Sequence, residues 1–192
     1  MNVYNILISG VGGQGVLLTS KIIAEAALLQ GLDVKQSEVH GMAQRGGSVL
    51  SQVRFGEKVF SPIVGEGEAD LLIGFEPLET ARYLHFLKDD GAVIYNTRPI
   101  GTIGASIAVE KYPADIDDVI KSRIKTIRPF DGTQLAVIAG DKRTLNLVML
   151  GAALKFIPLE ESIIIEAIVN TVPKRVLEIN QKAFAAGKAH VS

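Results

Sequence analysis

Along most of the chain, short apolar runs alternate with longer stripes of helical period. Runs typical of buried strands cover residues 4–9, 69–75, 91–96 and 126–130. The stripes between them predict helices that begin near residues 16, 77 and 116. Such an alternation of strand and helix predicts an α/β domain with a mostly parallel sheet.

One segment departs from this alternation. A second strand is expected at residues 33–38, but residues 39–47 carry three glycines and no helical stripe. Residues 48–55 then alternate between apolar and polar side chains, and Gly56-Glu57 suits a tight turn into residues 58–61. We therefore expect a hairpin of 48–55 with 58–61, an antiparallel excursion within a Rossmann-like three-layer fold.

The last part of the chain has only helical stripes. Four helices are expected there, over residues 134–139, 141–156, 159–170 and 174–186. The sequence shows no internal repeat, low-complexity tract or linker. A chain of 192 residues without such breaks is expected to fold as one domain, residues 1–192.

The charge and the apolar content limit the partners that we expect. The 20 basic and 21 acidic residues give a net charge of −1, so no field favours nucleic acid. The start of the chain lacks a basic segment followed by a long apolar stretch, and apolar runs such as Ile163–Ile165 are far shorter than the ~20 residues of a membrane span. We expect a cytoplasmic protein without membrane contact. The apolar fraction of 47% fits either a buried subunit interface or a core rich in alanine and isoleucine.

The absence of cysteine restricts the redox chemistry of the chain. With zero cysteines it has no disulfide, no thiolate-bound zinc and no cysteine-bound iron–sulfur cluster. Histidine, aspartate and glutamate show no metal-ligand spacing either. We expect no metal in this chain, and any electron transfer must take place in another one.

The first glycines predict a binding turn, because Gly10, Gly12 and Gly15 stand between a predicted strand and a predicted helix. In this spacing the first glycine permits the turn, the second lets a phosphate approach the backbone and the third allows close helix packing. The helix start also directs free N–H groups toward an anion. We predict a phosphate or nucleotide site at Gly10, Gly12, Gly13, Gln14 and Gly15; a purely structural turn is the alternative.

Four polar residues are further candidates. Glu38 stands where a NAD enzyme holds the ribose hydroxyls, although it can equally serve the loop that follows. His40 can transfer a proton or bind phosphate, and Arg45 can clamp a carboxylate or phosphate. Structural alternatives are a histidine bonded to a loop carbonyl and an arginine paired with Glu38 or with a partner subunit. Glu76 follows a strand at the edge where such sheets bind ligands, but a solvated glutamate at a helix start explains it as well.

Two segments together resemble a known family. Gly10–Val16 and Ser37–Ser48 closely resemble the γ-type domain of the 2-oxoacid:ferredoxin oxidoreductases, and most of all its indolepyruvate branch. Further similar stretches are Gly65–Leu72, Gly74–Pro77, Asn96–Pro99 and Asn146–Gly151. The resemblance covers nearly the whole chain.

The resemblance implies a subunit that is inactive alone. The family oxidatively decarboxylates 2-oxoacids, here indolepyruvate or other aryl pyruvates, forms acyl-CoA and CO2, and reduces ferredoxin. Thiamine diphosphate and [4Fe-4S] clusters belong to a large α subunit, which implies an α2β2 assembly and no cofactor held firmly by this chain. The family's catalytic residues have no counterpart here. We expect the chain to complete the active-site wall or the CoA entry, with His40 and Arg45 as contributors.

Two other classes stay open. A free-standing NAD- or ATP-binding protein is the main alternative, since adenylating enzymes also begin with such a glycine turn. It needs catalytic residues of its own, which the sequence does not offer. The third class is a nucleotide-sensing module that binds a phosphate ligand and changes partners.

Overall fold

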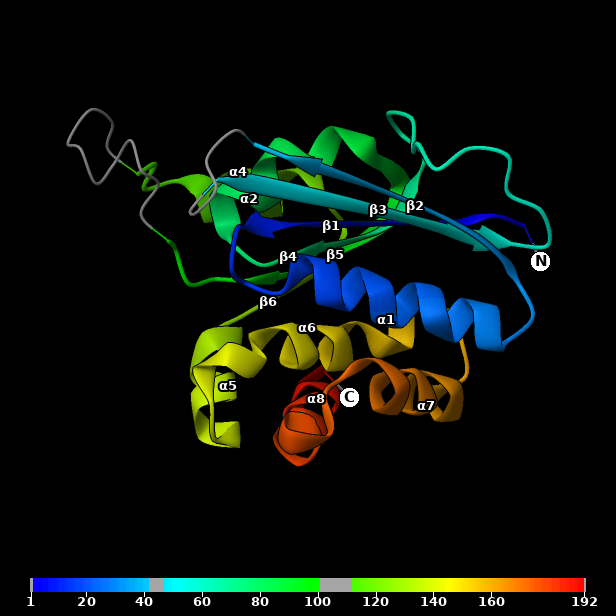
Figure 1. Ribbon diagram of the computed structural model, residues 1–192. Helices are drawn as coiled ribbons and strands as arrows, with labels where there is room; N and C mark the ends of the chain where they lie inside the picture. The colour runs from blue at the N-terminus through cyan, green and yellow to red at the C-terminus, as the bar shows by residue number, and fades with distance from the viewer. Residues whose placement is uncertain (1, 42–46, 101–111, 192) are drawn as a thin grey trace.

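The computed structural model describes residues 2–41, 47–100 and 112–191, and a six-stranded sheet forms its centre (Figure 1). The strand order is β2-β3-β1-β4-β5-β6. The bounds are β1 Tyr4–Val11, β2 Asp33–His40, β3 Ser48–Gly56, β4 Ala69–Gly74, β5 Leu87–Asn96 and β6 Thr126–Phe130. β3 is antiparallel to both of its neighbours, whereas β1, β4, β5 and β6 run parallel.

Helices cover both faces of the sheet and complete three layers (Figure 1). On one face lie α2 (Pro77–Arg82) and α4 (Ile116–Arg123). On the other lie α1 (Val16–Leu29) and α6 (Leu145–Ala153), with α5 (Gly132–Ala139), α7 (Glu161–Thr171) and α8 (Leu177–Val191) packed around them. The predicted mostly parallel α/β fold with an antiparallel excursion and a helical last part is confirmed. Among the described helices, none has the length and apolarity of a membrane span.

The antiparallel part of the sheet has a different strand pairing from the one predicted. β3 forms its hairpin with β2 rather than with residues 58–61, which are not a strand. Side chains hold that segment instead: Asp33 Oδ2 accepts from the Val59 N–H at 2.9 Å, and Arg54 Nη1 donates to the Ser61 carbonyl at 3.2 Å. The hairpin predicted from the Gly56-Glu57 turn is therefore wrong, because polar side chains satisfy the backbone that a strand ladder otherwise pairs.

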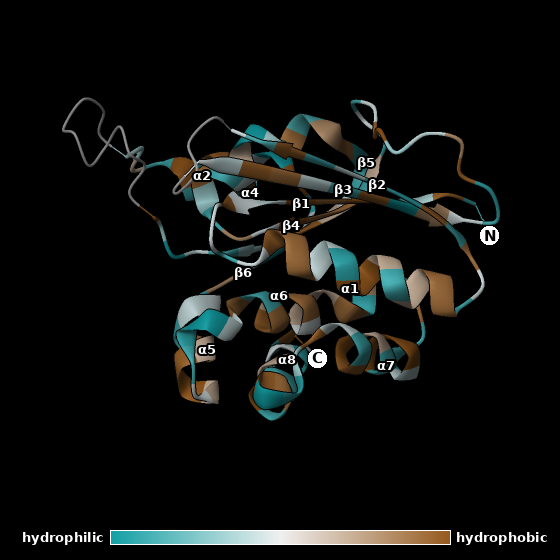
Figure 2. Ribbon diagram, viewed as in Figure 1, coloured by the Kyte–Doolittle hydropathy of each residue, from teal (hydrophilic) through white to brown (hydrophobic). Residues whose placement is uncertain are grey.

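Strand alternation places a core on each face of the sheet. In β1, Ile6 and Ile8 face α1 and α6, while Leu7 belongs to the cluster under α2 and α4. Figure 2 shows hydrophobic residues along the strands and along α1 and α6, the helices next to the sheet on their face of it. α6 is buried on all sides because α8 covers its outer face. The core thus fixes α1 and α6 on this face of the sheet, with their first turns near the carboxyl edge of the parallel strands, where the glycine turn lies.

Candidate functional site

The glycine turn joins β1 to α1 and contains two residues of left-handed conformation. Gly13 has φ +99° and Gly15 has φ +89°. A Cβ at Gly13 would meet nothing within 4 Å, whereas one at Gly15 would lie 2.8 Å from the Cβ of Asn146 in α6. Gly15 therefore permits the close approach of α1 and α6, and Gly13 leaves its backbone open to a ligand.

Gln14 fastens the turn to the neighbouring strand. Its Oε1 accepts from the Val11 N–H at 2.7 Å, and its Nε2 donates to the Phe75 carbonyl just after β4 at 2.8 Å. Gly10 fits the same contact, since a Cβ there would lie 2.8 Å from the Phe75 Cβ. Both ends of the Gln14 amide are thus engaged within the protein, and its side chain holds the shape of the turn.

The backbone N–H groups of the turn fall into two sets. Gly12 N donates to the Gly47 carbonyl at 2.9 Å, and Gln14 N donates to the Val11 carbonyl at 3.1 Å. The N–H groups of Gly13, Gly15 and the first turn of α1 find no acceptor among the residues that the structure describes. A helix start of this kind carries a partial positive charge and favours an anion.

A groove of about 610 Å³ opens beside these free N–H groups. It is lined by Val11, Gly12, Gly13, Gly15, Val16, Leu17, Leu18, His40, Gly41 and Val49. Its walls are mostly apolar, and His40 is the ionisable side chain among them. The arrangement can hold an anionic group at the helix start and an aliphatic chain along Leu17 and Leu18.

Of the other predicted site residues, some line the groove and others do not. His40 ends β2 and joins the turn in the groove. Glu38 is exposed on β2, accepts from Gln36 Nε2 at 3.1 Å and does not line the groove. Arg45 lies within residues 42–46, outside the described part of the chain. The structure therefore brings together the glycine turn and His40, and keeps Glu38 apart from them.

Glu76 is a buried helix cap rather than a solvated side chain. It is 1% exposed, its Oε2 accepts from the Glu79 N–H at 2.9 Å and its Oε1 accepts from the Tyr112 hydroxyl at 2.6 Å. Burial, with Glu76 beside it, raises the pKa of Tyr112, so this phenol stays a donor. Glu76 thus caps α2 through the Glu79 N–H and ties Tyr112 to the start of this helix.

The sequence analysis missed Glu79. Its carboxylate is 4% exposed and accepts from Ser48 Oγ at 2.6 Å, which ties the start of β3 to α2. Burial, and secondarily the nearby Glu76, raises the pKa of Glu79. The spacing of the two glutamates around Pro77, as cap and third helical residue, is the signal that sequence reasoning had available.

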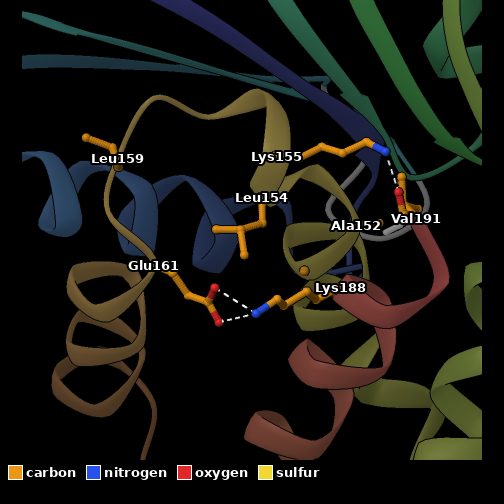
Figure 3. A pocket seen from close by; sticks show the side chains of 8 residues that line it. Ala152, Leu154, Lys155, Leu159, Glu161, Lys188 and Val191 are labelled. Carbon is orange, nitrogen blue, oxygen red and sulfur yellow. Dashed lines mark hydrogen bonds and ion pairs between the residues drawn. The ribbon is translucent and has the colours of Figure 1, made fainter.

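A second hollow, of about 280 Å³, lies between α6, α7 and α8 (Figure 3). Lys188 Nζ spans it to both carboxylate oxygens of Glu161, at 2.5 and 2.7 Å, and Lys155 Nζ donates to the Val191 carbonyl. These contacts join the last helix to its neighbours. None of the predicted site residues lines this hollow.

The described residues offer no metal centre: no group of three or more histidine, cysteine, aspartate or glutamate side chains is placed to hold an ion. Within this part of the chain, the free N–H groups and His40 are the features that favour a ligand.

Comparison with known proteins agrees with the resemblance of the two glycine segments. Residues 5–190 match the family model of pyruvate ferredoxin/flavodoxin oxidoreductase. An indolepyruvate oxidoreductase subunit IorB from Thermococcus kodakarensis is 42% identical over 193 residues, covering 97% of this chain and 95% of the relative. The subunit of the same name from Methanothermobacter thermautotrophicus is 42% identical over 188 residues, covering 96% and 95%.

A solved structure shows the same fold. The γ subunit of the keto/oxoacid ferredoxin oxidoreductase from Geobacter sulfurreducens superposes with a TM-score of 0.73 at 28% identity, over 98% of both chains. The predicted resemblance is confirmed, and the free-standing nucleotide-binding protein is not favoured. The chain belongs to the pyruvate ferredoxin/flavodoxin oxidoreductase family, as a subunit of a ferredoxin-dependent 2-oxoacid oxidoreductase.

Proposed function

We propose that this chain is the small subunit of a cytoplasmic indolepyruvate:ferredoxin oxidoreductase and that its glycine turn binds a phosphate group of CoA. The names of the relatives support the substrate class. The large subunit supplies thiamine diphosphate and iron–sulfur clusters in an α2β2 complex. A chain of 192 residues with zero cysteines fits this division, since it has no ligand for such clusters.

The free N–H groups at the start of α1 carry the proposal. CoA is an anion with several phosphate groups joined to a long flexible chain. The open backbone at Gly13 and the first turn of α1 can bind a phosphate, and Leu17 and Leu18 offer an apolar wall to the chain attached to it. His40, which also lines the groove, offers an imidazole N–H as a second donor to the anion.

The role of the chain is to position rather than to react. When bound in the large subunit, thiamine diphosphate would supply the decarboxylation chemistry, and the iron–sulfur clusters would carry electrons to ferredoxin. This chain holds the other end of CoA and so orients the thiol, which lowers the entropic part of the barrier. Arg45, by its place in the second glycine segment, is proposed to face the large subunit.

A matched pair of variants at Gly13 tests the phosphate site. Gly13→Asn and Gly13→Asp have nearly the same shape and both tolerate the left-handed conformation, but aspartate sets a negative charge beside the phosphate. In the reconstituted complex we expect the KM for CoA to be about tenfold higher with aspartate than with asparagine, equivalent to ~1.4 kcal/mol. The KM for indolepyruvate serves as the control and stays the same in both. Equal KM values for CoA would show that no phosphate of CoA binds at this turn.

A further inference from the structure

The two edges of the sheet differ in how they meet another strand. β6 has five residues, includes Pro129 and exposes Arg128 beside it. A short strand with proline and a cation is a protected edge. β2 has eight residues without proline, and its register with β3 runs without a bulge from Asp33↔Gly56 to His40↔Val49. The β2 edge carries one lysine, Lys35, but lacks the shortness and the proline that protect the β6 edge.

The hydrogen bond from Gly41 N to the Ser48 carbonyl, 2.8 Å long, fixes which backbone groups of β2 point outward. Pairs in an antiparallel ladder alternate between bonded and non-bonded, so the odd-numbered residues of β2 bond β3. The even-numbered residues therefore direct their N–H and C=O groups outward from the edge of the sheet. These residues are Val34, Gln36, Glu38 and His40. Lys35 Nζ donates to the Val34 carbonyl at 3.4 Å, and no strand among the described residues pairs with this row of groups.

The side chains of the same four residues lie on the α1 side of the sheet. Gln36 Nε2 donates to Ser20 Oγ in α1 at 2.7 Å, and His40 lines the groove of the glycine turn. Because side chains alternate along a strand, these four residues share the face of β2 that packs against α1.

An outer stripe of α1 runs beneath the β2 edge. It consists of Leu17, Leu18, Lys21, Ala24, Glu25 and Leu28. The first two line the groove of the glycine turn, and the others line a further hollow of about 370 Å³ together with Gln36 and the end of α7. Leu28 is 57% exposed. Apolar side chains from an added strand would cover both ends of this stripe.

We propose that the β2 edge binds an extended segment of the large subunit, which adds a strand to the sheet. Only another strand completes a regular row of backbone donors and acceptors, and the α1 stripe favours apolar residues at alternate positions of that strand. The edge ends at His40 in the groove. A segment bound there therefore brings the large subunit to the proposed CoA site, so this inference rests on the proposed function.

Two variants of one residue test the edge. Gln36→Pro removes an outward N–H and leaves the bonds to β3 intact, whereas Gln36→Ala removes the same side chain and keeps the N–H. In a binding assay with the purified large subunit, we expect the alanine variant to bind like the wild type and the proline variant at least about tenfold more weakly. The thermal unfolding of the isolated variants shows whether both are folded.

Hydrogen exchange gives a test that needs no variant. In the isolated chain the amides of residues 34, 36, 38 and 40 should exchange fast, and those of 35, 37 and 39 slowly. In the complex, the even-numbered amides should slow at least about tenfold and the odd-numbered ones should change little. Such a period-two pattern is specific to an added strand, because simple covering of the surface does not select alternate amides.

The outcomes separate the two proposals. A wild-type chain that never associates with the large subunit contradicts the proposed function. If Gln36→Pro associates with the large subunit and is active like the wild type, and if the even-numbered amides of β2 still exchange fast in the complex, only the proposal of an added strand is contradicted. If the isolated wild type is a dimer that Gln36→Pro converts to a monomer, the occupant is a second copy of this chain, and the proposal is overturned.

Discussion

At the scale of single residues, the glycine turn is held by one glutamine. Gln14 uses both halves of its amide, accepting from Val11 N and donating to the Phe75 carbonyl. A residue that only accepts cannot replace it, because a carboxylate would then face the Phe75 carbonyl oxygen. The identity of residue 14 therefore follows from the shape of the turn.

Gln14→Glu should lower the free energy of unfolding by about 1–3 kcal/mol, because the bond to the Phe75 carbonyl is lost and a carboxylate oxygen faces that carbonyl, which keeps its bond from Asn96 Nδ2. Gln30→Glu is the matched control, since Gln30 only accepts there, from Glu160 N at 2.9 Å. We expect the control to change stability by less than about 0.5 kcal/mol. Urea denaturation measures both variants, and equal losses would assign no fastening role to Gln14.

Glu79 predicts a pH dependence at the same scale. Burial raises its pKa in the folded chain above the ordinary value of 4.5, so the folded state binds the proton more tightly than the unfolded state. The contribution of this proton to stability is full below pH 4.5 and is lost as the pH rises through the raised pKa.

Glu79→Gln keeps an acceptor for Ser48 and does not ionise. We expect the stability of this variant, relative to the wild type, to increase with pH above 4.5 and to level off once Glu79 is ionised. Chemical denaturation at a series of pH values measures the difference. A difference that stays constant across the series contradicts the raised pKa.

At the scale of elements, α6 and α8 cross in backbone contact. A Cβ on Gly187 would lie 2.0 Å from the Val148 carbonyl oxygen, and one on Gly151 would lie 2.1 Å from the Phe184 carbonyl oxygen. Each glycine thus faces the backbone of the other helix, and neither backbone can move aside as a flexible side chain does. The crossing therefore helps to fix the position of α6. Asn146, at the start of α6, is the residue that contacts Gly15.

Gly187→Ala should destabilise the chain by about 3 kcal/mol, because the added methyl group forces the two helices apart. Gln181→Ala, on an exposed position of the same helix, is the control for an alanine that meets no other helix, and it should alter stability by less than about 0.5 kcal/mol. Thermal and urea unfolding check both. A small loss at Gly187 would mean that the crossing relaxes easily.

Sequence reasoning predicted elements better than contacts. The strand, turn and helix from residue 4 onward were correct because apolar period and glycine spacing are local signals. The predicted partner of β3 was wrong because side chains hold residues 58–63: Asp33, distant in sequence, and Arg54, within β3 itself. The contact of Gly15 with Asn146 and the bond of Glu79 to Ser48 were also hidden, since both join separate elements.

At the scale of the whole molecule, the chain offers a folded scaffold and a binding turn but no ligands for a redox cofactor. The chain has no cysteine, and its described part has no metal-binding cluster, yet it builds a complete core and an open anion-binding turn. The sheet is protected at β6 and open at β2, on the same side as the groove. This asymmetry gives the molecule one face suited to a partner.

The bond between Gly12 N and the Gly47 carbonyl has a thermodynamic consequence. It continues the β1–β3 ladder past its last strand pair, so the glycine turn and the end of the second glycine segment share one hydrogen bond. Coupling between two sites is reciprocal. If a phosphate that binds the turn strengthens this bond, it raises the affinity for any partner that strengthens the same bond through Gly47, and that partner must raise the affinity for the phosphate by the same factor.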